Sequence, residues 1–337
     1  MKNTESTSFV TDRLIFSIHS TIKHLVRKGS SVALFDFPNY PNVGDSAIWL
    51  GQELYFNKFI NAEIVAVDGC DLIGRSLPVL PPSTIVLIQG GGNFGDLYLH
   101  HQALREKLVS HYVDHRIIQL PQSIHFQDNN KKTQCRTILN KHKDFHLLVR
   151  DHDSLAQARE LHDGLSYLCP DMALCLGARQ RPVPPTYDIV CLLRTDKEKV
   201  PGELKDLQKK GSVLIADWLE EPDSFMKKTV SCVEKLLALY PRRMIMLYKY
   251  KRHFYHLLAK ERFVRGERLL SSGKVVITDR LHGHIMSTLL NIPHVVLDNN
   301  YGKIRNFRDA WGTGGSKCLA AECLDDAFEK AKGLLNI

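Results

Sequence analysis

Hydrophobic and polar positions alternate along the first half of the chain in a pattern that predicts strands and helices in turn. Short apolar runs rich in β-branched residues are typical of strands buried on both faces, and they cover residues 32–37, 63–67, 84–89, 116–120 and 145–149. Apolar residues recur at helical spacing between these runs, and the predicted helices cover residues 12–29, 46–56, 99–113, 131–141 and 152–161. Residues 1–11 are expected to form a loose arm. This succession predicts a mostly parallel, doubly wound sheet of the α/β class.

A second series follows a segment rich in proline and basic residues, residues 177–187, which is the best candidate for a linker. Its predicted strands cover residues 188–193, 213–216, 243–247, 274–278 and 294–297, and its predicted helices cover residues 223–239, 253–270 and 321–335. We therefore predict two Rossmann-like domains that face each other across a cleft, residues 1–180 and residues 181–337. The last helix is free to pack back on the first domain.

The stretch from Gly273 to Arg308 carries the clearest signal for a site. A buried strand, residues 274–278, ends at Asp279, Arg280 and His282, and a helix-like pattern then begins. Ligands of open α/β sheets bind at the carboxyl ends of the strands. Cationic groups at a helix N-terminus suit an anionic ligand. Taken alone, Arg280 could be a surface ion-pair partner and His282 a packed residue, but the whole cluster favours a site.

Three other side chains follow predicted strands. Arg194 occupies the same kind of position as Arg280, and two arginines that converge from parallel strands can clamp phosphate and carboxylate groups. Arg150 is expected to point into the cleft. His125 could act as a general acid or base because imidazole titrates near neutral pH, although a lone histidine is often structural.

Two turns could bring the backbone close to a ligand. Residues 90–92 are consecutive glycines directly after an apolar strand, and Asn93 and Asp96 beyond them could hydrogen-bond a sugar. Residues 42–46 read Asn-Val-Gly-Asp-Ser, where Gly44 permits a tight turn and Asp45 or Ser46 could cap the next helix. The functional interpretation is that the N–H groups at this helix start line the cleft. The alternative is a simple capped turn.

Composition and charge narrow the classes of function. The chain has 337 residues and a formal net charge of +8 with neutral histidines, a balance that suits anionic substrates or an anionic membrane surface. It lacks an aromatic-interleaved basic stripe and zinc-finger spacing, so we expect no nucleic-acid partner. Its eight cysteines form no CxxC pair, which predicts reduced thiols. With no apolar leader or span, we expect a cytoplasmic protein with at most peripheral contact at the inner membrane face.

Several chemistries have no motif in the sequence. The glycine run at residues 90–95 is by itself only weak evidence for a dinucleotide or ATP site and lacks the Gly-Lys-Ser/Thr of a P-loop, and no GxSxG elbow occurs. His282-Gly283-His284 lacks the spacing of helical zinc ligands, and His100-His101 has no cysteine or carboxylate framework around it. We therefore expect no metal, and we interpret His284 as structural.

Taken together, these residues resemble the polysaccharide pyruvyl transferase family over about residues 30–310. The shared features, in chain order, are Asn42-Val43-Gly44-Asp45, Gly90 to Gly92 with Asp96, Pro121-Gln122-Ser123, Arg150-Asp151 with Ser154, Asp171, and Arg280-Leu281-His282 followed by Asp298-Asn299 through Lys303. The Arg-Leu-His stretch after a buried strand is the most specific of them. Tyr301-Gly302-Lys303 departs slightly from the placement of tyrosine and lysine in many relatives.

The resemblance implies a reaction, a fold and a set of partners. The pyruvate unit of phosphoenolpyruvate would pass to two hydroxyls of a sugar in an exopolysaccharide or cell-surface glycan precursor, forming a pyruvate ketal and releasing phosphate. The fold would be similar to GT-B glycosyltransferases. Phosphoenolpyruvate is then a co-substrate, no other cofactor is expected, and the glycan acceptor could be lipid-linked. The acceptor sugar and the oligomeric state are not readable from the sequence.

The resemblance also implies roles for individual residues. Phosphoenolpyruvate would be bound by Arg194, Arg280, His282 and Lys303, and His282, Arg280 and His125 would be catalytic, without an assignment of which histidine is the acid. The residues expected on the acceptor side or along the cleft are Asn42, Gly44, Asp45, Gly91, Gly92, Asn93, Asp96, Gln122, Ser123 and Arg150. The segments expected to line the acceptor pocket are residues 38–43, 97–102 and 125–130.

Two other functions stay open on the sequence. A GT-B-like glycosyltransferase that uses a nucleotide sugar would place the same arginines on a diphosphate. A non-catalytic protein of glycan binding or assembly would keep the fold without needing the charged strand ends.

Overall fold

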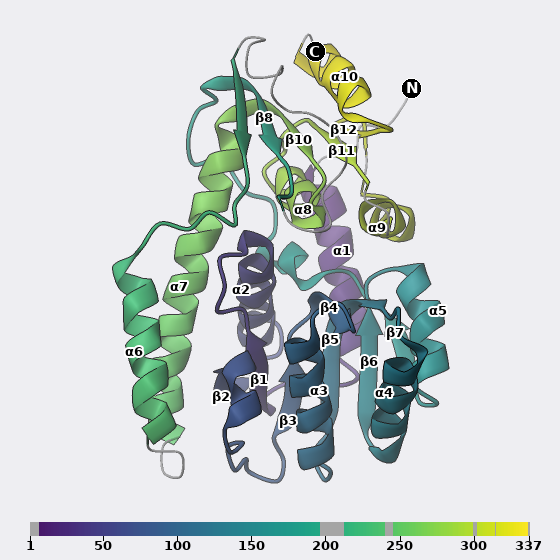
Figure 1. The fold of residues 1–337 in the computed structure, drawn as a ribbon, viewed down its shortest axis with the longest axis vertical. Coiled ribbons are helices and arrows are strands. Elements are labelled where there is room, and N and C mark those ends of the chain that lie inside the picture. The colour runs from purple at the N-terminus through teal and green to yellow at the C-terminus, as the bar shows by residue number, and fades with distance from the viewer. Residues whose placement is uncertain (1–6, 196–211, 240–244, 299–301, 314, 336–337) are drawn as a thin grey trace.

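Figure 1 shows the chain as a computed structural model that describes residues 7–195, 212–239, 245–298, 302–313 and 315–335. Its strands form two sheets, and every pairing between described strands is parallel. The first sheet has the order β2-β1-β3-β5-β6-β7 with β4 beside β5, and the second has the order β12-β11-β10-β8-β9. These parallel sheets confirm the α/β prediction.

The strand bounds follow the apolar runs closely. The strands of the first sheet are β1 (Ser31–Phe37), β2 (Glu63–Gly69), β3 (Ile85–Ile88), β4 (Gly91–Gly95), β5 (Ile117–His125), β6 (Phe145–Val149) and β7 (Ser166–Leu168). Those of the second sheet are β8 (Tyr187–Leu192), β9 (Val213–Ala216), β10 (Gly273–Thr278), β11 (His294–Leu297) and β12 (Cys318–Ala321).

Helices cover both faces of each sheet and also lie between the two sheets (Figure 1). The α-helices are α1 (Thr7–Ile22), α2 (Val43–Lys58), α3 (Leu99–His111), α4 (Asn129–Lys141), α5 (His152–Leu161), α6 (Phe225–Leu239), α7 (Ile245–Ser271), α8 (Leu281–Leu289), α9 (Lys303–Trp311) and α10 (Leu324–Leu335). Two 3₁₀ turns, η1 (Cys70–Gly74) and η2 (Met172–Leu176), follow strands of the first sheet.

Alternate residues of the central strands enter different cores because successive side chains of a strand point to opposite faces. On β1, Val32 and Leu34 join a core with α1 and α2, whereas Ala33 and Phe35 join a core with α3, α4 and α5. The first of these cores continues through α7 and α8 to Val276 on β10 of the second sheet. This shared layer of helices connects the two sheets.

The last helix, α10, packs against β10, β11 and β12 of the second sheet. The helix α10 therefore packs on the second sheet, whereas the sequence also allowed it to pack back on the first domain. The division of the chain near residue 180 stays a prediction. No helix within the described ranges is long and apolar enough to cross a membrane.

Several predicted elements need correction. Part of the predicted strand 243–247 lies outside the described residues, and Ile245 begins the long helix α7. A short apolar run cannot be told from a buried helix segment by its period alone, which explains this error. The supposed arm contributes to α1, which begins at Thr7, and β5 extends to His125. The glycines after β3 form strand β4, and β7, α9 and β12 were not predicted.

The packing of α1 can be tested by two substitutions in the same helix. Ile18 is fully buried in the core shared by both sheets, whereas Phe16 has 70% of its surface exposed. Ile18→Ala should lower the free energy of unfolding by about 2–5 kcal/mol because it leaves a cavity. Phe16→Ala should change it by less than about 0.5 kcal/mol. Urea unfolding of both variants measures the difference, and equal costs would contradict the placement of α1.

Candidate active site

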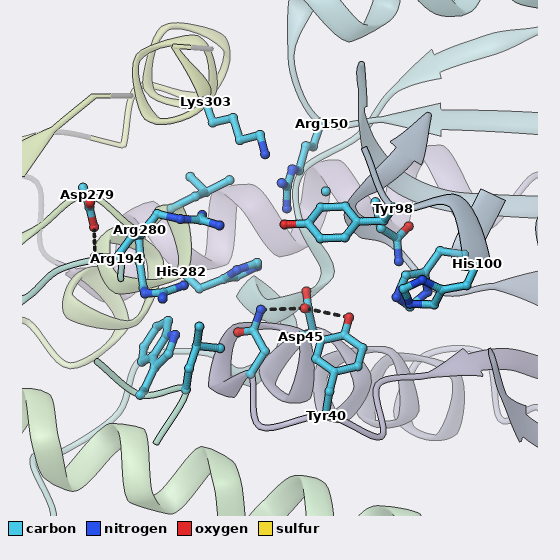
Figure 2. A pocket seen from close by; sticks show the side chains of 17 residues that line it. Tyr40, Asp45, Tyr98, His100, Arg150, Arg194, Asp279, Arg280, His282 and Lys303 are labelled. Carbon is cyan, nitrogen blue, oxygen red and sulfur yellow. Dashed lines mark hydrogen bonds between the residues drawn. The ribbon is translucent and has the colours of Figure 1, made fainter. Parts of the chain in front are cut away.

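A cavity of about 380 Å³ lies between the two halves of the chain, where strand ends of both sheets meet (Figure 2). It is lined by Tyr40, Asn42, Asp45, Gly92, Asn93, Tyr98, His100, His101, Arg150, Arg194, Trp218, Leu219, Asp279, Arg280, Leu281, His282 and Lys303. Four of these residues carry a permanent positive charge and two are carboxylates, so the lining favours an anionic ligand.

The two predicted arginines converge on this cavity. Strands β8 and β10 are neighbours in the second sheet, with Leu192 opposite Thr278, and Arg194 and Arg280 each lie two residues further along. The backbone N–H of Arg194 donates to Oδ1 of Asp279 at 2.9 Å, which ties the two strand ends together. The convergence expected from parallel strand ends is therefore confirmed.

Arg280 has a buried carboxylate partner that the sequence did not reveal. Its Nη2 donates to both oxygens of Asp217, at 2.6 and 2.7 Å, and its guanidinium lies 5.8 Å from the centre of the Trp218 ring. The same carboxylate accepts the backbone N–H and the hydroxyl of Thr195. Asp217 thus fixes the orientation of Arg280 and occupies its Nη2 atom. Only the other N–H groups of the guanidinium can reach a ligand.

His282 lies against the first half of the chain. A Cβ atom added to Gly44 would lie 2.4 Å from Nδ1 of His282, so only glycine leaves space for the imidazole. Gly44 was predicted to permit a tight turn, and the structure shows that its absent side chain admits a residue of the opposite half. Nε2 of His282 lies 3.4 Å from Oδ2 of Asp171, which is completely buried.

Asp171 connects His282 with Arg150. The Nη1 atom of Arg150 donates to Oδ2 of Asp171 at 2.6 Å, and its Nε donates to the hydroxyl of Ser123 at 3.0 Å. Burial raises the pKa of Asp171, but His282 and Arg150 outweigh this effect and hold that pKa below its ordinary value. An ionised Asp171 therefore fixes Arg150 and lies beside His282 on the wall of the cavity.

Gly92 and Lys303 bring a further cation to the same wall. A Cβ atom on Gly92 would lie 3.1 Å from Nη2 of Arg150 and 3.9 Å from Nζ of Lys303. Lys303 is the first residue of α9, and Asp298 caps this helix by accepting the N–H groups of Ile304 and Arg305. The missing side chain of Gly92 thus leaves space for Arg150 and Lys303, whereas the sequence suggested that the glycines leave space for a ligand.

Two residues at the start of α2, Asn42 and Asp45, line the cavity. The N-cap of α2 is Asn42, whose Oδ1 accepts the N–H of Gly44 at 2.9 Å, so the predicted caps Asp45 and Ser46 are wrong. Asp45 instead accepts hydrogen bonds from Nδ2 of Asn42 at 2.7 Å and from the hydroxyl of Tyr40 at 2.9 Å.

Several predicted residues do not line the cavity. Asp96 accepts the N–H groups of Gln127 and Asp128, and Gln122 bonds Asn93 and the carbonyl of Gln89. Gly44, Gly91, Ser123 and His125 are also absent from the lining. The hydroxyl of Ser123 instead accepts a hydrogen bond from Nε of Arg150. His125 ends β5 outside the cavity, so its predicted place beside the acceptor has no support, and its catalytic role stays untested.

Residues that the sequence assigned no role complete the cavity. Tyr40, Tyr98, His100 and His101 fall in the segments 38–43 and 97–102, which were expected to line the acceptor pocket, but no pattern singled them out. Figure 2 places Tyr40, Tyr98 and His100 on the side opposite Arg194, Arg280 and His282. Trp218 and Leu219 had no sequence signal.

His284 is structural, as predicted. Thr313 donates to its Nε2 at 2.9 Å, and its Nδ1 lies 2.8 Å from Nε2 of His294. Nδ1 of His294 in turn donates to the carbonyl of Ile292 at 2.8 Å. Burial lowers the pKa of His284 far below its ordinary value and lowers that of His294 to about 4, so both rings are neutral.

Comparison with known proteins places this chain among pyruvyl transferases. EpsO of Bacillus subtilis (strain 168), a protein assigned as a pyruvyl transferase, is 32% identical over 300 residues, which cover 88% of this chain and 89% of EpsO. Pyruvyl transferase 1 of Schizosaccharomyces pombe is 30% identical over 345 residues, covering 98% and 81% of the two chains.

A solved structure shares the fold. The crystal structure of a functionally uncharacterised Klebsiella pneumoniae protein superposes with a TM-score of 0.57 at 16% identity, covering 96% of this chain and 100% of that one. The sequence profile of the polysaccharide pyruvyl transferases matches residues 42–301, which include most of the cavity lining. The chain therefore belongs to the polysaccharide pyruvyl transferase family.

Proposed function

We propose that this chain transfers the pyruvate unit of phosphoenolpyruvate onto two hydroxyls of a sugar, forming a pyruvate ketal and releasing phosphate. The observation that carries the proposal is the set of cations that both halves direct to one cavity, Arg150, Arg194, Arg280 and Lys303. Phosphoenolpyruvate carries a carboxylate and a phosphate on one small carbon centre, so its binding needs several fixed positive charges. The family supports the same reaction type.

The bonds and protons of the reaction balance without a redox step. The first sugar hydroxyl attacks C2 of phosphoenolpyruvate while an acid protonates C3, which turns the methylene group into a methyl group. Phosphate then leaves C2, and the second hydroxyl closes the ketal at the same carbon. Of the two protons lost by the hydroxyls, one replaces the proton given to C3 and the other leaves with phosphate.

The donor subsite would lie beside Arg194, Arg280 and His282. Arg280, oriented by Asp217, would bind an oxygen of the anionic donor through the part of its fork that Asp217 leaves unoccupied. His282 would act as acid or ligand, since Asp171 lies on one side of the imidazole and the cavity on the other. The arginine and lysine side chains that line the cavity would also stabilise the charge on the departing phosphate.

The acceptor would occupy the opposite end of the cavity. Tyr40 and Tyr98 present aromatic surface there, and Asp45 presents a carboxylate that suits sugar hydroxyls (Figure 2). Asn93 also lines the cavity. We further propose that the two sheets correspond to the Rossmann-like halves of a GT-B-like fold, which is supported by their parallel order and the cavity between them. A glycan precursor is the proposed acceptor, and its attachment to a lipid stays a prediction.

Turnover tests the reaction directly. The protein is incubated with phosphoenolpyruvate and galactose-, mannose- or glucose-type glycans, and the proposal expects free phosphate together with a product that gains the mass of a pyruvate ketal. A thermal-shift titration with UDP, GDP and phosphoenolpyruvate provides the comparison. Stabilisation by a nucleotide diphosphate but not by phosphoenolpyruvate would favour a glycosyltransferase and would contradict the proposal.

Arg280→Lys tests the fixed guanidinium. The lysine keeps the charge but cannot hold Asp217 with two contacts and reach the ligand as well, so kcat/KM should fall roughly 10²–10³-fold. The matched control is Arg268→Lys, at an exposed position of α7, which should leave kcat/KM unchanged. Steady-state phosphate release measures both, and wild-type activity of Arg280→Lys would rule out this role.

Gly44→Ala tests the contact between the two halves. The added methyl group would overlap the ring and Cβ of His282, so the imidazole must move and kcat/KM should fall about 10²-fold or more. Gly333→Ala in α10 is the control, because a Cβ atom there has no neighbour within 4 Å. Circular dichroism checks that both variants fold, and full activity of a folded Gly44→Ala would show that the position of His282 is unimportant.

A further inference from the structure

A cluster of metal-ligand side chains lies at the acceptor end of the cavity. It consists of Asp36 on β1, Cys70 at the start of η1, and His100 and His101 in the first turn of α3. The sequence showed the two histidines without a cysteine or carboxylate framework, but folding brings Asp36 and Cys70 to them. The expectation that nothing surrounds this pair is therefore wrong.

The distances within the cluster are short. Sγ of Cys70 lies 2.7 Å from Oδ1 of Asp36 and 2.8 Å from Nδ1 of His101, and Nδ1 of His101 lies 2.7 Å from the same Oδ1. One ligand atom of His100 lies within 4.8 Å of the ligand atoms of Cys70 and His101. One sulfur and two imidazole nitrogens thus lie close enough together to share an ion, and Asp36 lies beside Cys70 and His101.

The surroundings suit a site that is closed on one side and open on the other. Asp36 and His101 are buried, whereas His100 and His101 also line the cavity. Asn93 donates from Nδ2 to Oδ2 of Asp36 at 3.3 Å, and the edge of Tyr40 packs on the His101 ring with centres 5.6 Å apart. Such outer contacts orient the ligands of metal sites.

We propose that Cys70, His100 and His101 bind one divalent cation of the zinc class, with Asp36 as the outer carboxylate that orients His101. A thiolate, imidazoles and a carboxylate are the donors that zinc prefers, and sites of catalytic type keep one position open toward a cavity. Zinc bonds of about 2.0–2.3 Å in a tetrahedron place ligand atoms ~3.5 Å apart. Sγ of Cys70 and Nδ1 of His101, which lie 2.8 Å apart, would need to separate by less than ~1 Å.

A second cluster, His284, His294 and Cys318, does not fit an ion as well. The ring nitrogens of both histidines already serve one hydrogen-bond chain that runs from Thr313 to the carbonyl of Ile292. All three side chains are buried and none of them lines the cavity. An ion there would break this chain and would have no open position for a ligand.

The ion has a consequence that rests on the proposed function. A hydroxyl of the sugar acceptor would take the open position, because both histidines line the cavity and His100 lies at the end opposite Arg194 and Arg280 (Figure 2). The cation would then lower the pKa of this hydroxyl and favour its attack on C2. Ion binding itself does not depend on the reaction.

Cobalt binding tests the site without reference to activity. The full-length protein is freed of metal with a chelator and titrated with Co²⁺ while its absorption spectrum is recorded. We expect one Co²⁺ per chain, with a thiolate charge-transfer band in the near ultraviolet that Zn²⁺ abolishes by displacement. Cys70→Ser should remove the band. Cys232→Ser, at an exposed position, should retain it.

Three results would overturn the proposal. The first is a folded wild-type protein without a thiolate band, and the second is a band that persists in Cys70→Ser. The third is loss of the band in Cys318→Ser, which would place the ion at the second cluster. A missing band together with full ketal formation would reject the metal site while leaving the proposed function standing. A normal band without any turnover would do the reverse.

Discussion

The pairing of buried carboxylates with cavity cations is the interaction on which the site depends. Asp217 holds Arg280 from the second half of the chain, and Asp171 holds Arg150 while facing His282. A buried charge without a partner costs several kcal/mol, so each carboxylate makes its cation tolerable at a strand end that is largely closed to water. The same contacts fix the direction of each guanidinium, which matters for recognition of carboxylate and phosphate groups.

This electrostatic arrangement requires the two sheets to keep their relative position. The helices α1, α2, α7 and α8 form one continuous apolar core with the inner faces of both sheets. Gly44, at the start of α2, admits the imidazole of His282 from α8, so the packing of the halves and the chemistry of the cavity meet at one contact. Tight packing of this kind leaves little room for adjustment.

The sequence predicted those parts of the site that follow from local order along the chain. Arg194 and Arg280 could be predicted because each follows an apolar run and parallel strands end at the same edge of a sheet. Asp217 and Asp171 acquire their roles only from partners far away in the sequence. The same is true of Cys70 and Asp36 around His101. His125 shows the opposite case, since it was predicted to follow a strand and to be catalytic, whereas it is the last residue of β5 and is absent from the cavity lining.

A crystal structure of the protein soaked with phosphoenolpyruvate would locate the donor site. We expect the donor in the cavity between the sheets, with its carboxylate or phosphate oxygens in contact with Arg194, Arg280 and Lys303 and with its reactive carbons facing His282. Electron density for the donor at another surface, or an anion that contacts none of these three cations, would contradict this expectation.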